Sequence, residues 1–338
     1  MLALRKTKSG VGNVELMEVD VPEIKDDEIL MKVWAAGICG SDLLIQDDKH
    51  FYEVPVTLGH EYSGIADKIG PKVTRVRTGD KIVSDIETRE GWLGVTRDGA
   101  YAAYMAIPEA QIHVYPDSVS LDRACFTEQL VGIIHCMQER SQIRAGDFVV
   151  IVGPGPMGLL GVQFAKLSGA RAVALIGLKK DQKRLQIGKK VGADYTLYSE
   201  EHPEEAVRDL NNGRGADFIL ECSASEKGFQ HAIDCAKRAP EGPGGAGVIT
   251  SASLWGKPIT IDADAISLYQ LTIHGGWSWN GSDSWERAVS IISSGKLDLD
   301  TLMTNRYTLE EWEKAFANLR SGEDVKAFVH PNGTDWAK

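Results

Sequence analysis

Cysteine is scarce in this 338-residue chain, which contains five, an odd number at irregular spacing. An extracellular domain held together by disulfides would carry an even and closely spaced set. The pattern therefore excludes a disulfide framework and favours reduced thiols, which are typical of intracellular proteins. We expect a cytoplasmic protein on this ground.

Two further features are missing: a long apolar run and an excess of positive charge. No stretch approaches the apolar length that spans a bilayer, and the first residues lack the apolar core of a secretory signal. Lysine and arginine number 37 against 48 acidic residues, for a formal net charge of -11. Because nucleic-acid binding needs a basic face, we expect no nucleic-acid or membrane partner, and a small-molecule substrate instead.

What the sequence does contain is a change of pattern near residue 142. Before it, short strand patterns alternate with glycine and proline turns, which is typical of a β-barrel-like or sandwich-like domain. Residues 143–282 alternate strands with helices, as a parallel doubly wound sheet does. Two helical patterns follow in 283–338, and we expect this tail to rejoin the first domain. The predicted fold class is α/β, with a discontinuous first domain made of 1–142 and 283–338.

The most specific pattern is the segment 148–158, FVVIVGPGPMG. An apolar strand ends in a G-x-G-x-x-G turn, and a helical pattern follows. In this context the first glycine allows a tight turn, the second admits a pyrophosphate, and the third lets the helix pack closely. We interpret the motif as a dinucleotide site; the alternative is an ordinary strand–helix turn that merely needs glycine. The predicted cofactor contacts are Gly153, Gly155, Pro156, Met157 and Gly158.

Residues with metal-ligand side chains lie outside this motif: Cys39 in GICGSD, His60 in GHEYSG, and Glu128 ahead of the dinucleotide segment. Thiolate, imidazole and carboxylate are ligand types that zinc prefers, and catalytic zinc uses three protein ligands with a fourth position open. Each residue alone is not decisive, since a lone cysteine is usually a small buried hydrophobe and a lone histidine is usually structural.

Together these motifs resemble the zinc-dependent medium-chain dehydrogenase/reductase superfamily of alcohol dehydrogenase-like proteins. The resemblance rests on Cys-Gly-Ser-Asp, Gly-His-Glu-x-x-Gly, a later Gly-Asp-Lys-Ile at 79–82, the glycine motif, and the tail RYTLEEWEKAF at 306–316. These motifs occur in that order over nearly the whole chain. The polyol (sorbitol-type) and threonine dehydrogenases form the most similar branch.

The resemblance implies a GroES-like β-barrel catalytic domain, a Rossmann domain and a cleft between them. It implies a catalytic zinc ion held by Cys39 and His60. Either Glu61 or Glu128 would be the carboxylate ligand, with the other close by. Ser41 would accept the proton of a secondary alcohol, whose hydride passes to NAD or NADP. Relatives form homodimers and homotetramers, and we expect one of these assemblies here.

Two departures from the family pattern concern the metal and the proton path. The family's usual lobe, in which four cysteines hold a structural zinc, corresponds to residues 86–104, which contain no cysteine. We therefore expect one catalytic zinc ion per chain and no structural zinc. Many relatives carry a proton-relaying histidine where this chain has Leu44, so the relay partner beyond Ser41 is open.

A third departure is Gly177, at the end of the second Rossmann strand. An acid at this point would bond the adenosine ribose and repel a 2′-phosphate. Its absence favours NADP over NAD, and positive charge follows at Lys179, Lys180 and Arg184. The alternative is that the two lysines cover a solvated helix start.

The substrate expected from the branch is a polyol or sugar-like alcohol, with an amino-alcohol or a simple secondary alcohol next. Tyr52, Trp277 and Trp279 are candidate pocket walls, although aromatic clusters are as often core packing. The polar group of Ser278 or Asn280 is a candidate for binding substrate hydroxyls. Two rival interpretations stay open. One is a zinc-free reductase of the same superfamily, and the other is a nucleotide-binding protein without catalysis.

Overall fold

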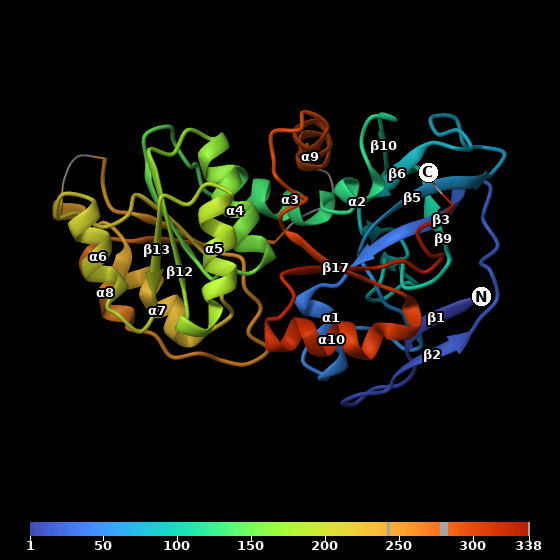
Figure 1. The fold of residues 1–338 in the computed structure, drawn as a ribbon, viewed down its shortest axis with the longest axis horizontal. Coiled ribbons are helices and arrows are strands. Elements are labelled where there is room, and N and C mark those ends of the chain that lie inside the picture. The colour runs from blue at the N-terminus through green and yellow to red at the C-terminus, as the bar shows by residue number, and fades with distance from the viewer. Residues whose placement is uncertain (242–243, 278–282, 337–338) are drawn as a thin grey trace. The chain divides into compact units, whose positions relative to one another are not determined.

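The computed structural model describes residues 1–241, 244–277 and 283–336, and the chain divides into two compact units (Figure 1). The first unit comprises Met1–Glu128, Trp279–Gly295 and Met303–Lys338, and the second comprises Gln129–Ser278 and Lys296–Leu302. The first segment of the first unit therefore ends at Glu128, before residue 142. The short return of 296–302 is tied to the second unit by Gln163, whose side chain exchanges two hydrogen bonds with the backbone of Asp298.

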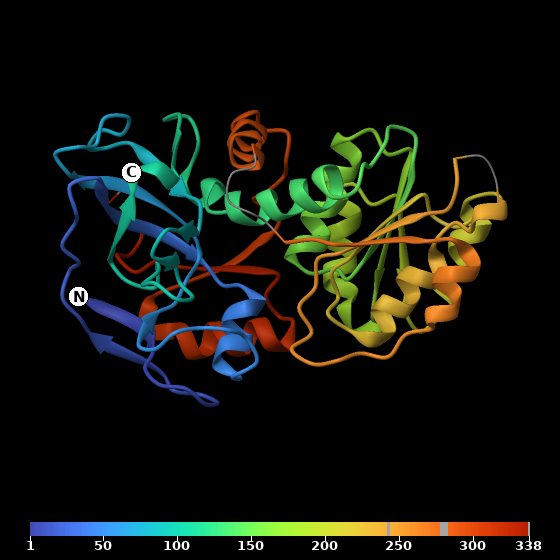
Figure 2. The same cartoon turned by 180° about the vertical axis from the view of Figure 1, so that it is seen from behind.

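The second unit is built on a six-stranded parallel sheet in the order β13-β12-β11-β14-β15-β16. Counted from β11, this is the 3-2-1-4-5-6 order of a doubly wound Rossmann domain. Every residue of β11 (FVVIV) is buried, as expected for a central parallel strand covered on both faces. Helices α4 and α5 pack on one face of the sheet, and α6, α7 and α8 on the other (Figures 1 and 2).

The strands of the second unit are β11 (Phe148–Val152), β12 (Ala172–Gly177), β13 (Tyr195–Tyr198), β14 (Phe218–Glu221), β15 (Val248–Ser251) and β16 (Thr272–Gly275). Its α-helices are α4 (Pro156–Leu167), α5 (Gln182–Lys190), α6 (Pro203–Leu210), α7 (Glu226–Cys235) and α8 (Ala263–Tyr269). Short 3-10 turns are η3 (Lys179–Asp181) and η4 (Ala239–Glu241), and the π-helix η2 (His135–Glu139) follows α3 (Thr127–Ile134), which begins in the first unit.

The first unit contains a seven-stranded sheet that follows the path β10-β6-β5-β3-β18-β17, with β9 also pairing β3. A three-stranded sheet β2-β1-β4 and a two-stranded hairpin β7-β8 complete it. The hairpin occupies the 86–104 lobe, where Arg97 Nη2 lies 2.6 Å from the buried Glu28 Oε1. No helix in the described ranges has both the length and the hydrophobicity needed to cross a bilayer.

The strands of the first unit are β1 (Leu2–Lys6), β2 (Val14–Glu18), β3 (Glu28–Gly37), β4 (Val56–Thr57), β5 (Glu61–Ile69), β6 (Lys81–Ser84), β7 (Glu87–Thr88), β8 (Gly91–Trp92), β9 (Tyr104–Pro108), β10 (Ile112–Tyr115), β17 (Met303–Tyr307) and β18 (Lys326–Val329). Its helices are α1 (Gly40–Gln46), α2 (Leu121–Ala124), α9 (Ser284–Ser293) and α10 (Trp312–Ser321), with 3-10 turns η1 (Glu109–Gln111) and η5 (Leu309–Glu311).

The C-terminal tail contributes directly to the first unit. Strand β18 pairs antiparallel with β3, with Phe328 opposite Gly37. Helix α10 contacts α1 (Figure 1). The turn before α10 begins as a capping box, in which Glu311 Oε2 accepts a hydrogen bond from the Thr308 amide at 3.0 Å. Because β3 lies between β5 and β18, residues from both ends of the chain meet at the end of β3.

Candidate metal and cofactor site

Backbone pairing brings the predicted metal ligands together in the first unit. Strand β3 ends at Gly37, two residues before Cys39, and β5 starts at Glu61, directly after His60. Gly37 and Glu61 are partners in the antiparallel register of β3 and β5. The end of one strand and the start of its neighbour therefore place Cys39 beside the histidine and glutamate.

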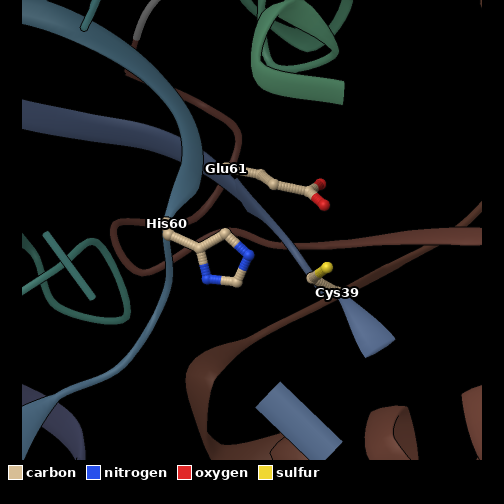
Figure 3. Close-up of side chains that lie close together, drawn as sticks. All are labelled: Cys39, His60 and Glu61. Atoms are coloured by element: carbon tan, nitrogen blue, oxygen red, sulfur yellow. The ribbon is translucent and has the colours of Figure 1, made fainter. Parts of the chain in front are cut away.

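The three side chains point toward one another (Figure 3). One ligand atom from each of Cys39, His60 and Glu61 lies within 4.8 Å of the other two. Cys39 is half-buried, His60 is buried, and Glu61 has no exposed surface. Glu61 and Glu128 are both candidates for the carboxylate ligand, and this cluster contains Glu61.

Asp42 orients His60, and the sequence analysis did not single it out. Its carboxylate Oδ1 lies 3.5 Å from His60 Nδ1, while Oδ2 accepts hydrogen bonds from the Cys39 amide at 2.9 Å and the Tyr101 hydroxyl at 2.7 Å. On the opposite edge of the ring, Nε2 lies 3.1 Å from Ser41 Oγ. A carboxylate behind a ligating histidine is the usual outer support of a metal site. The place of Asp42 in the Cys-Gly-Ser-Asp motif is the sequence feature that could have identified it.

Two motif glycines are required by the crowding around these ligands. Gly59 has φ +93°, and a Cβ on it would lie 2.7 Å from the ring of Tyr101. A Cβ on Gly37 would lie 2.6 Å from Glu61 Oε2. Both contacts are too short for a real side chain, so glycine at these positions lets the strand ends approach the cluster.

Lys326 is the second functional residue that sequence reasoning missed. Its ammonium group pairs with Glu61 Oε2 and donates to the Ile38 carbonyl at 3.1 Å, and neither Lys326 nor Glu61 has exposed surface. A lysine opening the otherwise apolar strand β18 (KAFV) was the only local sign. No pattern in the sequence connects it to Glu61, because 265 residues separate them.

The titration of the cluster reflects its burial and its crowded acids. Burial, reinforced by Glu61, raises the pKa of the Cys39 thiol, and the same two causes raise the pKa of Glu128 to about 7. Burial opposes the charged form of His60, yet Asp42 and Cys39 raise its pKa well above the usual value. The charge of Glu61 therefore acts on Glu128, although Glu128 lies outside the three-residue ligand group.

The cluster fits a zinc ion by its chemistry and by an unmet hydrogen-bonding need. Thiolate, imidazole and carboxylate form a zinc-type donor set. Within the described part of the chain, Glu61 Oε1 is buried and has no hydrogen-bond partner. Buried polar atoms are normally paired, and a cation held between Cys39, His60 and Glu61 would satisfy this oxygen.

The second unit holds the predicted dinucleotide motif at the turn between β11 and α4. Gly153 has φ +106°, and a Cβ on it would lie 2.9 Å from the backbone of Cys222. A Cβ on Gly158 would collide with the Gly153 carbonyl, so this glycine closes the helix onto the turn. Gly155 differs, because a Cβ there would meet nothing within 4 Å. That open surface, with Pro156 and Met157 in the first turn of α4, fits the approach of a pyrophosphate.

The residues at the end of β12 have structural contacts that the sequence does not indicate. A Cβ on Gly177 would lie 2.8 Å from Pro154 Cγ, so close packing against the glycine motif also explains the missing acid. Lys179 Nζ lies 2.7 Å from Glu201 Oε1 in an exposed ion pair. Lys180 is exposed and Arg184 is half-buried in the first turns after the strand.

Of the candidate substrate residues, Tyr52 has an evident structural role. Its hydroxyl bonds to Asp48 and accepts from the Gly10 amide at 3.2 Å, and its ring lies 5.0 Å from Lys6 Nζ. Tyr52 thus joins the N-terminal loop to the segment before β4. Trp277 is half-buried and lies two residues after β16 in the second unit. Ser278, Trp279 and Asn280 lie outside the described residues.

Two family models match the chain. The model described as alcohol dehydrogenase GroES-like domain matches residues 25–117, and the one described as zinc-binding dehydrogenase matches residues 156–294. The first match lies in the unit that holds Cys39, His60 and Glu61. The second begins inside the glycine motif and covers most of the parallel sheet.

Named proteins are similar over the whole length. A sorbitol dehydrogenase from Halalkalibacterium halodurans is 33% identical, with 98% of this chain and 99% of that protein covered. An L-threonine 3-dehydrogenase from Pyrococcus horikoshii is 32% identical, with 96% and 97% covered. Among solved structures, a zinc-binding dehydrogenase from Sinorhizobium meliloti bound to NADP superposes with a TM-score of 0.87 at 27% identity, covering 98% of this chain and 99% of that one.

Proposed function

Since the chain belongs to the zinc-dependent, alcohol dehydrogenase-like family of medium-chain dehydrogenases/reductases, we propose that it oxidises a secondary alcohol reversibly with one catalytic zinc ion and NADP in preference to NAD. The predicted family, the GroES-like and Rossmann folds, and the enzyme class are confirmed by these matches. The protein is an NAD(P)-dependent alcohol or polyol dehydrogenase. The zinc ion, the preference for NADP and the roles of individual residues form the proposal.

The observation that carries the zinc proposal is the convergence of Cys39, His60 and Glu61 within 4.8 Å. In the proposed site Cys39 and His60 hold the ion, and Glu61 and Glu128 share the carboxylate position. One ion per chain is proposed, because the lobe at 86–104 contains no cysteine. When bound, the zinc ion would supply Lewis acidity toward the substrate hydroxyl, and the nicotinamide would supply the hydride acceptor.

The chain's own residues would handle the proton and the geometry. Ser41, whose Oγ lies 3.1 Å from His60 Nε2, is the proposed first proton relay: its hydroxyl would accept the substrate's hydroxyl proton and pass its own proton outward. Asp42 holds the ring of His60 in place, and Asp42 is itself fixed by Tyr101. Lys326 balances the negative charge of Glu61 in a region with no exposed surface.

The cofactor proposal assigns the glycine motif to the pyrophosphate and the end of β12 to the adenosine ribose. The preference for NADP is supported by the absent acid at Gly177 and by the NADP-bound relative from S. meliloti. Lys180 and Arg184 are the proposed cations facing a 2′-phosphate. Lys179 is a third proposed cation, but its ammonium group also pairs with Glu201. Trp277 remains the proposed substrate wall, and the proposed substrate is a polyol or sugar-like alcohol, in line with the sorbitol dehydrogenase relative. We further propose a homodimer or homotetramer.

The test is metal quantification followed by a substrate screen. Purified protein should contain about one zinc ion per chain, as expected for a single set of three protein ligands with one open position. The screen covers polyols, amino-alcohols and simple secondary alcohols, each with NAD and NADP, and follows absorbance of the reduced nicotinamide. We expect turnover of a polyol, with a higher kcat/KM for NADP than for NAD.

Each rival interpretation predicts a different result from the same measurements. Full activity in protein that contains no zinc, or that has been dialysed against a chelator, would indicate a zinc-free reductase. Cofactor binding without turnover across the whole panel would indicate a nucleotide-binding protein. A higher kcat/KM with NAD would contradict the cofactor preference alone.

Gly155→Ala tests the cofactor site separately from the fold. Gly155 has φ -77° and ψ -178°, which alanine adopts without strain, and the added Cβ meets nothing within 4 Å. We expect the Kd for the cofactor to rise at least about 10-fold, because the methyl group blocks the pyrophosphate. The thermal midpoint should stay within about 2 °C of wild type. Gly158→Ala, which collides with the Gly153 carbonyl, should instead lower the midpoint clearly; unchanged cofactor binding in Gly155→Ala would contradict the assigned motif.

A further inference from the structure

The backbone and side-chain donors at the end of β12 are already bonded to acids of the same chain. The Leu178 amide donates to Asp181 Oδ2 at 3.0 Å, and the Lys179 amide lies 3.2 and 3.1 Å from the two carboxylate oxygens of Glu200. The ammonium group of Lys179 lies 2.7 Å from Glu201 Oε1. The hydrogen bond and charge of Glu201 are also the main causes that raise the pKa of Lys179.

Glu200 is held in this position by the sheet. Strand β13 runs parallel to β12 with Tyr198 opposite Gly177, and the next amide, of Ser199, donates to the Gly177 carbonyl at 2.8 Å. Ser199 is buried and lies 3.0 Å from His231 Nε2 through its hydroxyl. The chain leaving β13 therefore still runs beside the end of β12 at Ser199, and Glu200 follows one residue after this fixed point.

A Rossmann domain places its ribose-binding acid at this same end of the sheet, where the parallel strands have their carboxyl ends. That acid normally ends the second strand, here β12, and bonds the ribose 2′-hydroxyl. In this chain the position is Gly177, where a Cβ would lie 2.8 Å from Pro154 Cγ and would have to displace this ring. Glu200, which follows the third strand β13, brings a carboxylate to the amide of Lys179, two residues after Gly177.

We propose that Glu200 is a specificity-determining residue that limits the affinity for NADP, by holding a carboxylate on the Lys179 amide where a 2′-phosphate would otherwise accept hydrogen bonds. Glu201 acts in the same sense by engaging the Lys179 ammonium group. NAD carries a neutral hydroxyl at that position and does not compete with either acid. The inference rests on the proposed binding of a nicotinamide cofactor at the glycine motif, and it holds whichever cofactor the wild type prefers.

The test measures the binding of NAD and of NADP to the Glu200→Gln variant by calorimetry, in the absence of substrate. Removing the charge should lower the Kd for NADP about 5-fold, the size expected for one partly exposed charge contact, and leave the Kd for NAD within about 2-fold. Glu200→Gln/Glu201→Gln should enlarge this gain, since it also releases the Lys179 ammonium group that Glu201 engages. Glu205→Gln is the matched control, because it removes one exposed acid from the same unit on α6.

The outcomes separate this inference from the proposed function. An unchanged ratio of the two Kd values in Glu200→Gln would overturn it, whatever the wild-type preference. An equal gain in Glu205→Gln would also overturn it, because net charge alone would then account for the effect. A wild type that prefers NAD, together with a selective gain for NADP in Glu200→Gln, would overturn only the proposed NADP preference and would support the role of Glu200.

Discussion

Cys39→Ala is expected to abolish zinc binding and to lower kcat/KM at least about 1,000-fold, while cofactor binding changes less than about 2-fold. The loss follows because Cys39 supplies the only thiolate of the cluster with His60 and Glu61. Cofactor binding should survive, since the glycine motif lies in the other unit. Metal content by mass spectrometry, cofactor Kd by calorimetry and steady-state rates give the three measurements.

The matched control for Cys39→Ala is Cys235→Ala, which removes a buried thiol from the second unit. It should keep its zinc and its turnover, although truncating a buried side chain lowers stability slightly. If Cys39→Ala retained a full zinc complement, the proposed ligand set would be wrong even with activity lost. If it lost zinc and kept its rate, the metal would have no part in catalysis.

The parts of this protein that could be predicted from sequence are those encoded by neighbouring residues. The glycine motif occupies one turn, and its strand and helix flank it directly, so pattern alone identifies it. The ligands Cys39 and His60 were reached through short motifs whose glycines, Gly37 and Gly59, are required by the packing of the cluster itself. Their convergence required the register of β3 and β5, which the sequence does not state.

The parts that could not be predicted depend on contacts between distant strands. Lys326 meets Glu61 because β18 is inserted beside β3, and Glu200 meets the end of β12 because β13 runs parallel to it. Lys179 was predicted as a cofactor contact, which stays a prediction, and its ammonium group lies 2.7 Å from Glu201 Oε1. In each case the sequence gives no sign of the partner of the charged side chain. Only the pairing of strands in the folded protein brings the two residues together.

The buried pair of Lys326 and Glu61 gives the largest expected effect on stability. In metal-free protein, Lys326→Met should lower the free energy of unfolding by about 3–5 kcal/mol, because it leaves the Glu61 carboxylate buried without a counter-charge. Both side chains have no exposed surface, so water cannot replace the lysine without rearrangement. Glu61→Gln should cost a similar amount for the opposite reason, since it strands the ammonium group. Chemical unfolding after chelation measures both, and chelation keeps a metal cation from compensating.

The double variant Glu61→Gln/Lys326→Met separates a specific charge pair from general crowding. With both charges removed, we expect it to be more stable than either single variant, because no uncompensated buried charge is left. Lys6→Met is the control: Lys6 is also buried, but the hydrogen-bond partners of its ammonium group are the carbonyls of Gly10 and Gly12. Adding Glu61→Gln to Lys6→Met should therefore recover nothing. Additive losses in the Glu61 and Lys326 double variant would mean that the two residues do not act as a pair, and Glu61 would then need another source of compensation within the site.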